Sequence, residues 1–125
     1  MKVTAEKNEK VAEMIFESIY PLYLNRLEKN GRTKEEFHQV IEWLTGFDED
    51  TLQTLITEKV TFRTFFEKAK MHPNAHMIKG VVCGYRIEEI DDKFEVYKQC
   101  RQMEKLIDEL AKGRKMEKIL REEKK

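Results

Sequence analysis

The chain has 125 residues, of which 40% are hydrophobic, and this suffices for one domain with a single core and no disulfide or metal support. Its 24 basic and 24 acidic residues cancel to a formal net charge of zero, which argues against the basic field of a nucleic-acid binder. No apolar run approaches the about 20 residues that a membrane helix needs, and the two cysteines form no CxxC pair, so we expect a reduced cytoplasmic protein with no membrane partner.

The first segment is expected to be helical. Glu6, Glu9 and Glu13 stand where a secretory signal would be apolar, and residues 1–10 are expected to be frayed, as are 122–125 at the other end. Because Pro21 lacks the amide hydrogen that a helix interior needs, either this helix kinks there or a second helix begins at Pro21. Its apolar residues recur at helical spacing and are Val11, Met14, Ile15, Ile19 and Leu22.

Capping residues divide the middle of the chain into short helices. Thr33 and Glu36 form a capping-box pattern, which opens a helix that Gly46 ends. Asp48 and Thr61 are each suited to cap a further helix. The apolar faces of these three helices consist of Phe37, Val40, Ile41, Leu44, Leu52, Leu55, Ile56, Phe62, Phe65 and Phe66.

The segment from Phe94 to Ala111 predicts the longest helix. A heptad-like seam runs along it, formed by Val96, Cys100, Met103, Ile107 and Leu110. This seam fits one helix lying across a domain core, and it also fits an intermolecular coiled-coil pairing. Together the segments predict an all-α fold, a single compact domain of about six short helices in an orthogonal-type bundle that spans residues 1–125.

The stretch from Ile78 to Ile90, IKGVVCGYRIEEI, fits two local structures. If it is helical, Gly80 and Gly84 open a side-chain-free groove on one face. If it is extended, Val81 to Ile87 forms a short segment bounded by glycine. We interpret Cys83 as a small buried packing residue, because cysteine is among the most buried residue types. The rim of any ligand site here would consist of Tyr85, Arg86, Glu88 and Glu89.

Cys83 also supports a second hypothesis, a small-ligand site or thiol-dependent enzyme. A nucleophilic cysteine needs a lowered thiol pKa, and Arg86 lies near enough in sequence to supply a cation. No histidine is placed beside the sulfur by its spacing, so we assign no catalytic residue. Trp43 and Tyr85 are the aromatic residues that we expect to be partly exposed beside a cleft.

Cofactor motifs are absent from the sequence. There is no phosphate-binding glycine loop and no GxSxG motif. His72, His76 and Cys83 have a permissive spacing for a metal, but Pro73 disfavours a helical histidine pair. We therefore predict no metal site and no cofactor.

The basic segment from Lys112 to Arg121, KGRKMEKILR, carries five basic residues and one acidic residue. We interpret it as a solvated last helix, and nucleic-acid binding through it is a weaker alternative. The favoured function is a noncatalytic protein-interaction or binding module, and a homodimer is one form that this hypothesis includes. Its protein partner, or any small-molecule ligand, is left open by the sequence.

Five blocks of the sequence belong together: Ile19 to Tyr23, Gly31 to Glu36, Ile41 to Phe47, Ile78 to Ile90 and Leu106 to Arg121. In this order they resemble a bacterial family known as domain of unknown function 2200. The resemblance implies a small, mostly helical, single-domain bacterial protein, and it carries no activity, cofactor or catalytic residue over to this chain. An N-terminal extension and Lys93, where proline after the acidic pair is more usual, depart from the family pattern.

Overall fold

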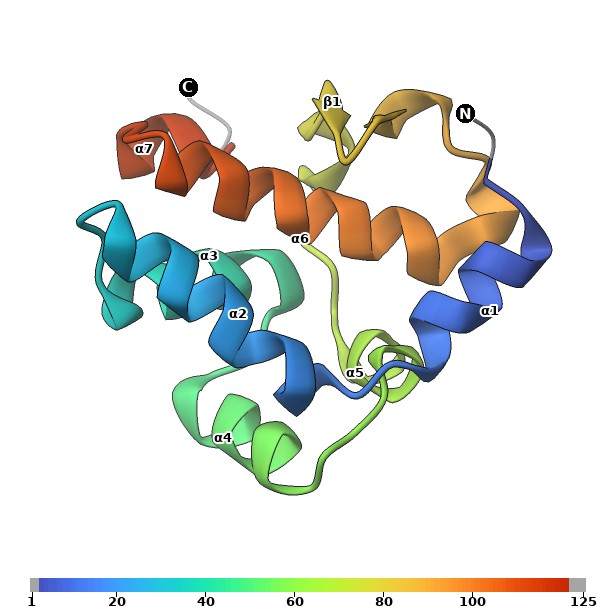
Figure 1. The fold of residues 1–125 in the computed structure, drawn as a ribbon, viewed down its shortest axis with the longest axis horizontal. Coiled ribbons are helices and arrows are strands. Elements are labelled where there is room, and N and C mark those ends of the chain that lie inside the picture. Colours follow the sequence, from blue (N-terminus) through green and yellow to red (C-terminus); the bar gives the residue numbers. More distant parts are fainter. Residues whose placement is uncertain (1–2, 122–125) are drawn as a thin grey trace.

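Helix α6 (Glu95–Ala111) lies across the middle of the protein in the computed structural model, which describes residues 3–121 (Figure 1). Nine of its 17 residues are buried, and they include four of the five seam residues, so the interpretation as a core helix is confirmed. The elements that contact it include α1 (Ala5–Glu13), α2 (Phe16–Lys29), α3 (Lys34–Thr45), α5 (Phe62–Lys68), α7 (Met116–Ile119) and strand β1 (Val81–Val82).

The first helical segment breaks earlier than the sequence predicted. Helix α1 ends at Glu13, and Ile15 then pairs with Thr61 in an isolated antiparallel bridge before α2 begins. Pro21 is neither a break nor a start, since it lies inside α2 on the exposed side. The prediction of one continuous apolar stripe was therefore wrong, and Leu22 is 62% exposed.

Helix α1 is ordered along much of the segment that we expected to be frayed. The Thr4 side chain caps it by accepting a hydrogen bond from the Lys7 backbone N–H, at 3.2 Å. The Tyr97 backbone N–H donates to Asn8 Oδ1 at 2.9 Å, which ties α1 to the first turn of α6. Packing against α6 thus compensates the end fraying that an isolated helix would show. Residues 122–125 lie outside the described part of the chain.

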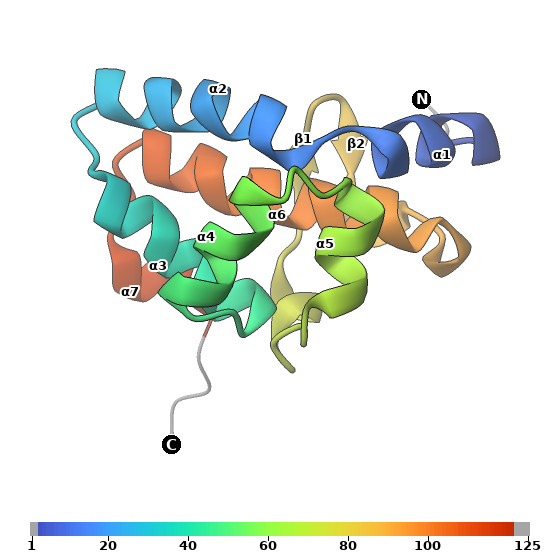
Figure 2. The same ribbon diagram turned by 90° about the horizontal axis from the view of Figure 1, so that it is seen from below.

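The predicted caps of the middle helices are confirmed. Thr33 and Glu36 form a complete capping box at α3, and Gly46 ends that helix in the left-handed conformation with φ of 76°. Asp48 and Thr61 cap α4 (Glu49–Thr57) and α5 through their side chains. Figure 2 shows α3, α4 and α5 in a row beneath α2 and α1.

The segment between α5 and α6 is extended, so the helical groove interpretation is wrong. Strand β1 pairs antiparallel with β2 (Tyr85–Arg86), with Val82 opposite Tyr85. Cys83 and Gly84 form the two-residue turn, with φ of 53° and 81°, as a type I′ hairpin turn requires. Cys83 is therefore exposed at the hairpin tip, and its interpretation as a buried packing residue is also wrong, whereas Cys100 is buried.

Three short 3-10 helices complete the connection between α5 and α6: Ala75–Met77, Ile87–Glu89 and Asp92–Phe94. The last of them leads directly into α6, so Lys93 is accommodated in a tight turn before the long helix begins. The fold is mostly helical and forms a single domain, as predicted. Among the described residues, no helix combines the length and the apolar character that crossing a bilayer demands.

We expect Leu106→Ala to lower the free energy of unfolding by about 2–5 kcal/mol, because this α6 side chain is completely buried and its truncation leaves a cavity. Leu22→Ala serves as the matched control. It removes the same atoms from an exposed site, so it should change the free energy by no more than about 0.5 kcal/mol. Urea denaturation followed by circular dichroism measures both values, and equal losses would contradict the assignment of α6 as the core helix.

Candidate functional site

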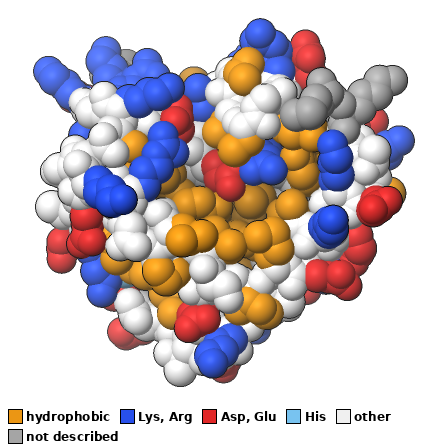
Figure 3. All heavy atoms as spheres, viewed as in Figure 1, with side chains coloured by type: hydrophobic (Ala, Val, Ile, Leu, Met, Phe, Trp, Pro, Cys, Tyr) orange, Lys and Arg blue, Asp and Glu red, His pale blue; other side chains and the backbone are white. Residues whose placement is uncertain are grey.

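A cleft of about 460 Å³ opens between α1, the hairpin and α6. Three of its seven lining residues are cationic and none is a carboxylate. Figure 3 shows hydrophobic side chains gathered over the middle of the face that α1, α2 and α6 present in Figure 1. The cleft is lined by Lys7, Lys10 and Val11 of α1, Met14 just after that helix, Tyr85 of the hairpin, and Tyr97 and Arg101 of α6.

Tyr85 joins the three elements of the cleft. Its ring packs edge-on against Tyr97, with 5.4 Å between ring centroids and an interplanar angle of 75°. Lys7 Nζ donates to the Tyr85 hydroxyl at 2.8 Å, and this hydrogen bond lowers the pKa of Tyr85. The Arg101 guanidinium lies 4.6 Å from the Tyr97 ring centroid and donates to the Tyr97 hydroxyl at 3.0 Å.

Glu104 is a carboxylate that pairs with the cleft residue Arg101 but does not itself line the cleft. It makes an ion pair with Arg101, and the two side chains are only 17% and 16% exposed, so solvent screens the pair weakly. The Tyr23 hydroxyl of α2 donates to Glu104 Oε2 at 2.8 Å, and burial raises the pKa of Tyr23. The Cys83 thiol donates to Glu104 Oε1 at 3.5 Å. One carboxylate thus links α2, α6 and the hairpin tip.

The environment of Cys83 opposes thiolate formation. Partial burial and the Glu104 carboxylate raise the pKa of the thiol, and the opposing effect of Arg101 is smaller. Arg86, the cation that the sequence suggested for this role, instead lies 3.9 Å from Glu88 and 3.8 Å from Glu89. The Cys83 thiol is therefore placed as a hydrogen-bond donor to Glu104, and its surroundings do not activate it as a nucleophile.

The structure separates most of the residues that the sequence suggested for one site. Tyr85 is the one that lines the cleft, and Cys83 adjoins it through Glu104. Arg86 and Glu89 line a different depression of about 470 Å³ near Ile90 and Phe94, to which Tyr85 also contributes. Glu88 lines a third pocket.

Trp43 lies elsewhere. It is half-buried on α3 and stacks on His72, with 4.2 Å between ring centroids. It does not line the cleft.

The residues that sequence reasoning missed were Lys7, Lys10, Tyr97 and Arg101. Tyr97 and Arg101 carried a detectable signal, since residues four apart on a predicted helix share a face, but nothing local indicated that α1 would join them.

A second polar cluster ties α2, α3 and α4 together. His38 is 3% exposed, its Nε2 is hydrogen-bonded to the Tyr20 hydroxyl, and its Nδ1 lies 2.8 Å from Glu49 Oε1. Burial raises the pKa of Tyr20 to about 12, so its hydroxyl remains protonated at neutral pH. With both ring nitrogens occupied, the cluster serves to hold three helices in register.

The same cluster contains the side chains best placed to hold a metal. Potential ligand atoms of His38, Glu42 and Glu49 all lie within 4.8 Å of one another. Burial and the neighbouring Glu49 carboxylate raise the pKa of Glu42. A divalent cation there would replace the hydrogen bond between His38 and Glu49. Within residues 3–121, His72, His76 and Cys83 form no such group.

Fold and cleft together define a small, mostly helical, single-domain protein with an open, cation-lined surface cleft. The chain belongs to the family described as uncharacterized protein conserved in bacteria, DUF2200, whose model matches residues 10–121, and the predicted resemblance is confirmed. It is similar to the crystal structure of uncharacterized protein SP1917, with 33% sequence identity and a TM-score of 0.83 over 93% of this chain and 97% of that chain. No curated protein matches the sequence.

We expect the alkylation of Cys83 by iodoacetamide, measured in a Cys100→Ser background, to inflect above the ordinary thiol pKa of about 8.5. The raised thiol pKa is the reason, since only the thiolate reacts. Glu104→Gln should lower the inflection, because it removes the negative charge beside the sulfur. An inflection near neutral pH, unchanged in Glu104→Gln, would instead indicate a reactive cysteine.

Proposed function

We propose that the protein is a noncatalytic interaction module, and that the cleft between α1, the hairpin and α6 docks an acidic segment of a partner protein. The observation that supports this proposal is the composition of the lining. Exposed Lys7 and Lys10 stand beside apolar Val11 and Met14, and no carboxylate lies among the lining residues. Such a surface attracts negative charge, and burial of an apolar side chain on it would stabilise a complex.

The charge available to a partner comes from α1. Arg101 is already paired with Glu104, so its charge is largely compensated inside the cleft. Lys7 donates to the Tyr85 hydroxyl and makes no ion pair with a carboxylate within residues 3–121, so its positive charge is available to a ligand. Lys10 lies one helical turn further along α1 and extends the cationic rim.

The apolar part of the cleft favours a protein partner. Met14 is 40% exposed, and methionine is a flexible side chain that adapts to different apolar surfaces. Tyr85 and Tyr97 add an aromatic wall beside it. A partner segment would therefore place an apolar side chain on Met14 and Tyr97 and its carboxylates near Lys7 and Lys10.

The other hypotheses have less support. The raised thiol pKa of Cys83 argues against a thiol-dependent enzyme. In the basic segment from Lys112 to Arg121, Arg114 and Arg121 pair with Glu109 and Lys112 pairs with Asp108. These internal ion pairs support a structural role for the segment and leave less positive charge for a phosphate backbone.

We expect a short capped peptide of alternating glutamate and phenylalanine to shift the backbone NMR signals of α1, the hairpin and the first half of α6. Its lysine-phenylalanine counterpart should not bind. The double substitution Lys7→Glu and Lys10→Glu should weaken binding of the acidic peptide at least about tenfold, because it converts attraction into repulsion. A titration followed by two-dimensional NMR measures both the location and the affinity.

The double substitution Lys115→Glu and Lys118→Glu is the matched control, since it makes the same charge change at exposed lysines of the C-terminal segment. It should leave the shifted residues unchanged and alter the affinity much less. The docking proposal would be overturned if both double variants lost the same affinity. Binding of the acidic peptide at another surface of the wild-type protein would overturn it as well.

A further inference from the structure

The cluster of His38, Glu42 and Glu49 combines the donor types of a zinc site. His38 and Glu42 lie four positions apart on α3, so their side chains project from the same face of that helix. Glu49 lies in the first turn of α4, which the Asp48 side chain caps. One imidazole and two carboxylates thus converge from two helices, and their potential ligand atoms lie within 4.8 Å of one another.

The His38 ring is oriented for coordination through Nδ1. The residue is 3% exposed, and its Nε2 is hydrogen-bonded to the Tyr20 hydroxyl of α2. A histidine that binds a metal through one ring nitrogen donates the hydrogen of the other to a neighbouring group, which fixes the tautomer and the orientation of the ring. When Nε2–H donates to Tyr20, Nδ1 carries the lone pair that a metal binds, and it lies 2.8 Å from Glu49 Oε1.

The charge around His38 favours a cation. The Glu42 carboxylate is half-buried beside Glu49, and it makes no hydrogen bond or ion pair to another side chain within residues 3–121. Asp48 adds a further negative charge nearby. Lys34 lies on the same side of the protein as Glu49, but it forms no ion pair with these carboxylates in the described part of the chain. A bound cation would neutralise this local negative charge.

Small rotations of the glutamate side chains complete the coordination geometry. Zinc binds nitrogen and carboxylate oxygen at about 2.0–2.2 Å, which places the ligand atoms of a tetrahedral site about 3.3–3.6 Å apart. The Glu49 side chain is 55% exposed, so it can move this far without disturbing the core. Its Oε2 accepts from Gln53 at 3.2 Å, which supports the carboxylate from the next turn of α4. The exposed side of the cluster leaves a fourth position open to solvent.

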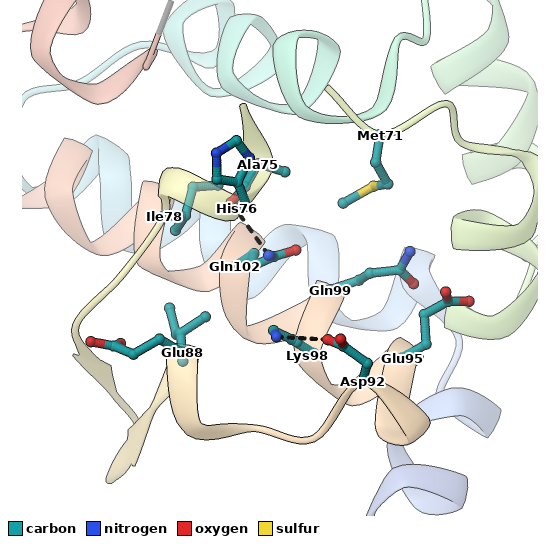
Figure 4. A pocket seen from close by; sticks show the side chains of 11 residues that line it. Met71, Ala75, His76, Ile78, Glu88, Asp92, Glu95, Lys98, Gln99 and Gln102 are labelled. Carbon is teal, nitrogen blue, oxygen red and sulfur yellow. Dashed lines mark hydrogen bonds and ion pairs between the residues drawn. The ribbon is translucent and has the colours of Figure 1, made fainter. Parts of the chain in front are cut away.

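The third pocket, shown in Figure 4, lacks this combination. There Asp92 accepts a hydrogen bond from Lys98 at 2.8 Å, and Glu88 accepts one from the Gly80 backbone N–H at 3.0 Å. The imidazole in that lining, His76, is exposed and is hydrogen-bonded to a backbone carbonyl through Nδ1. Two of its carboxylates are therefore already paired, and its side chains form no group of converging ligand atoms among the described residues.

We propose that His38, Glu42 and Glu49 bind one divalent metal ion of the zinc type. His38 Nδ1 and one oxygen from each glutamate are the protein ligands, and Tyr20 orients the imidazole. The mixed nitrogen and oxygen donors favour zinc over magnesium, which prefers oxygen ligands alone. The ion replaces the hydrogen bond between His38 and Glu49 and joins α3 to α4. The prediction of no metal site rested on the other two histidines and did not consider this one.

The test is a titration of zinc chloride into the isotopically labelled full chain, under reducing conditions and without a chelator. NMR follows the ring nitrogens of the three histidines. Zinc should shift the His38 Nδ1 signal saturably at one equivalent, and magnesium at the same concentration should not. The proposal is wrong if zinc leaves the His38 ring unchanged, if zinc binds only through His76 or Cys83, or if magnesium binds equally well. The site is separate from the docking cleft, so none of these results bears on the proposed function.

The variant Glu42→Gln keeps the size of the side chain and removes one charged ligand, so it should weaken zinc binding at least about tenfold in calorimetry. Because the Glu42 carboxylate makes no hydrogen bond within the described residues, the variant should remain folded, and an unchanged backbone NMR spectrum shows this. Glu35→Gln is the matched control at an exposed position of the same helix, and it should leave the affinity unchanged. Equal zinc affinity in wild-type protein and Glu42→Gln would overturn the assignment of this ligand set.

Discussion

The ion pair between Arg101 and Glu104 on α6 is the interaction on which the candidate site depends. A charge pair that is largely removed from water is stable only when further hydrogen bonds satisfy its remaining donors and acceptors. Here Tyr23 of α2 and Cys83 of the hairpin donate to Glu104, and Arg101 donates to Tyr97. Arg101 Nε is the one group of the pair that is buried without a hydrogen-bond partner among the described residues. The pair therefore fixes the positions of elements that are distant in the sequence.

This arrangement explains why the cleft is cationic although the chain as a whole is neutral. Glu104 lies behind the cleft and is fully engaged by hydrogen bonds, so it compensates Arg101 without presenting a carboxylate to the opening. Arg101 in turn lies against the Tyr97 ring, and Tyr97 supports Tyr85. The exposed lysines of α1 then face an aromatic and apolar wall. Lys7 lies outside the residues that the family model matches, whereas Lys10 lies within them.

The local features of this fold were predictable, and the contacts between distant segments were not. Capping side chains act within three or four residues, which is why Thr33, Asp48 and Thr61 marked the starts of α3, α4 and α5 correctly. The break before α2 is different, because Ile15 leaves the helical conformation to pair with Thr61, 46 positions along the chain. No pattern within α1 or α2 encodes that bridge.

The hairpin shows the same limit. The β-branched residues between Gly80 and Gly84 are compatible with a helix and with a strand. The two structures are distinguished by the positive φ at both Cys83 and Gly84, which a type I′ hairpin turn requires. Once the turn places Cys83 at the tip, its burial can no longer be inferred from residue type. The contact of Lys7 with Tyr85 spans 78 positions of sequence, so the cleft itself exists only in the folded protein.

A double-mutant cycle on Arg101→Met and Glu104→Gln tests the central claim most directly. Free energies of unfolding are measured for the wild-type chain, the two single variants and the double variant by urea denaturation. If the pair organises the site, the two substitutions will be coupled by about 0.5–3 kcal/mol, because each single variant leaves the other side chain without its partner. If the losses simply add, with a coupling below about 0.3 kcal/mol, the pair does not hold these elements together.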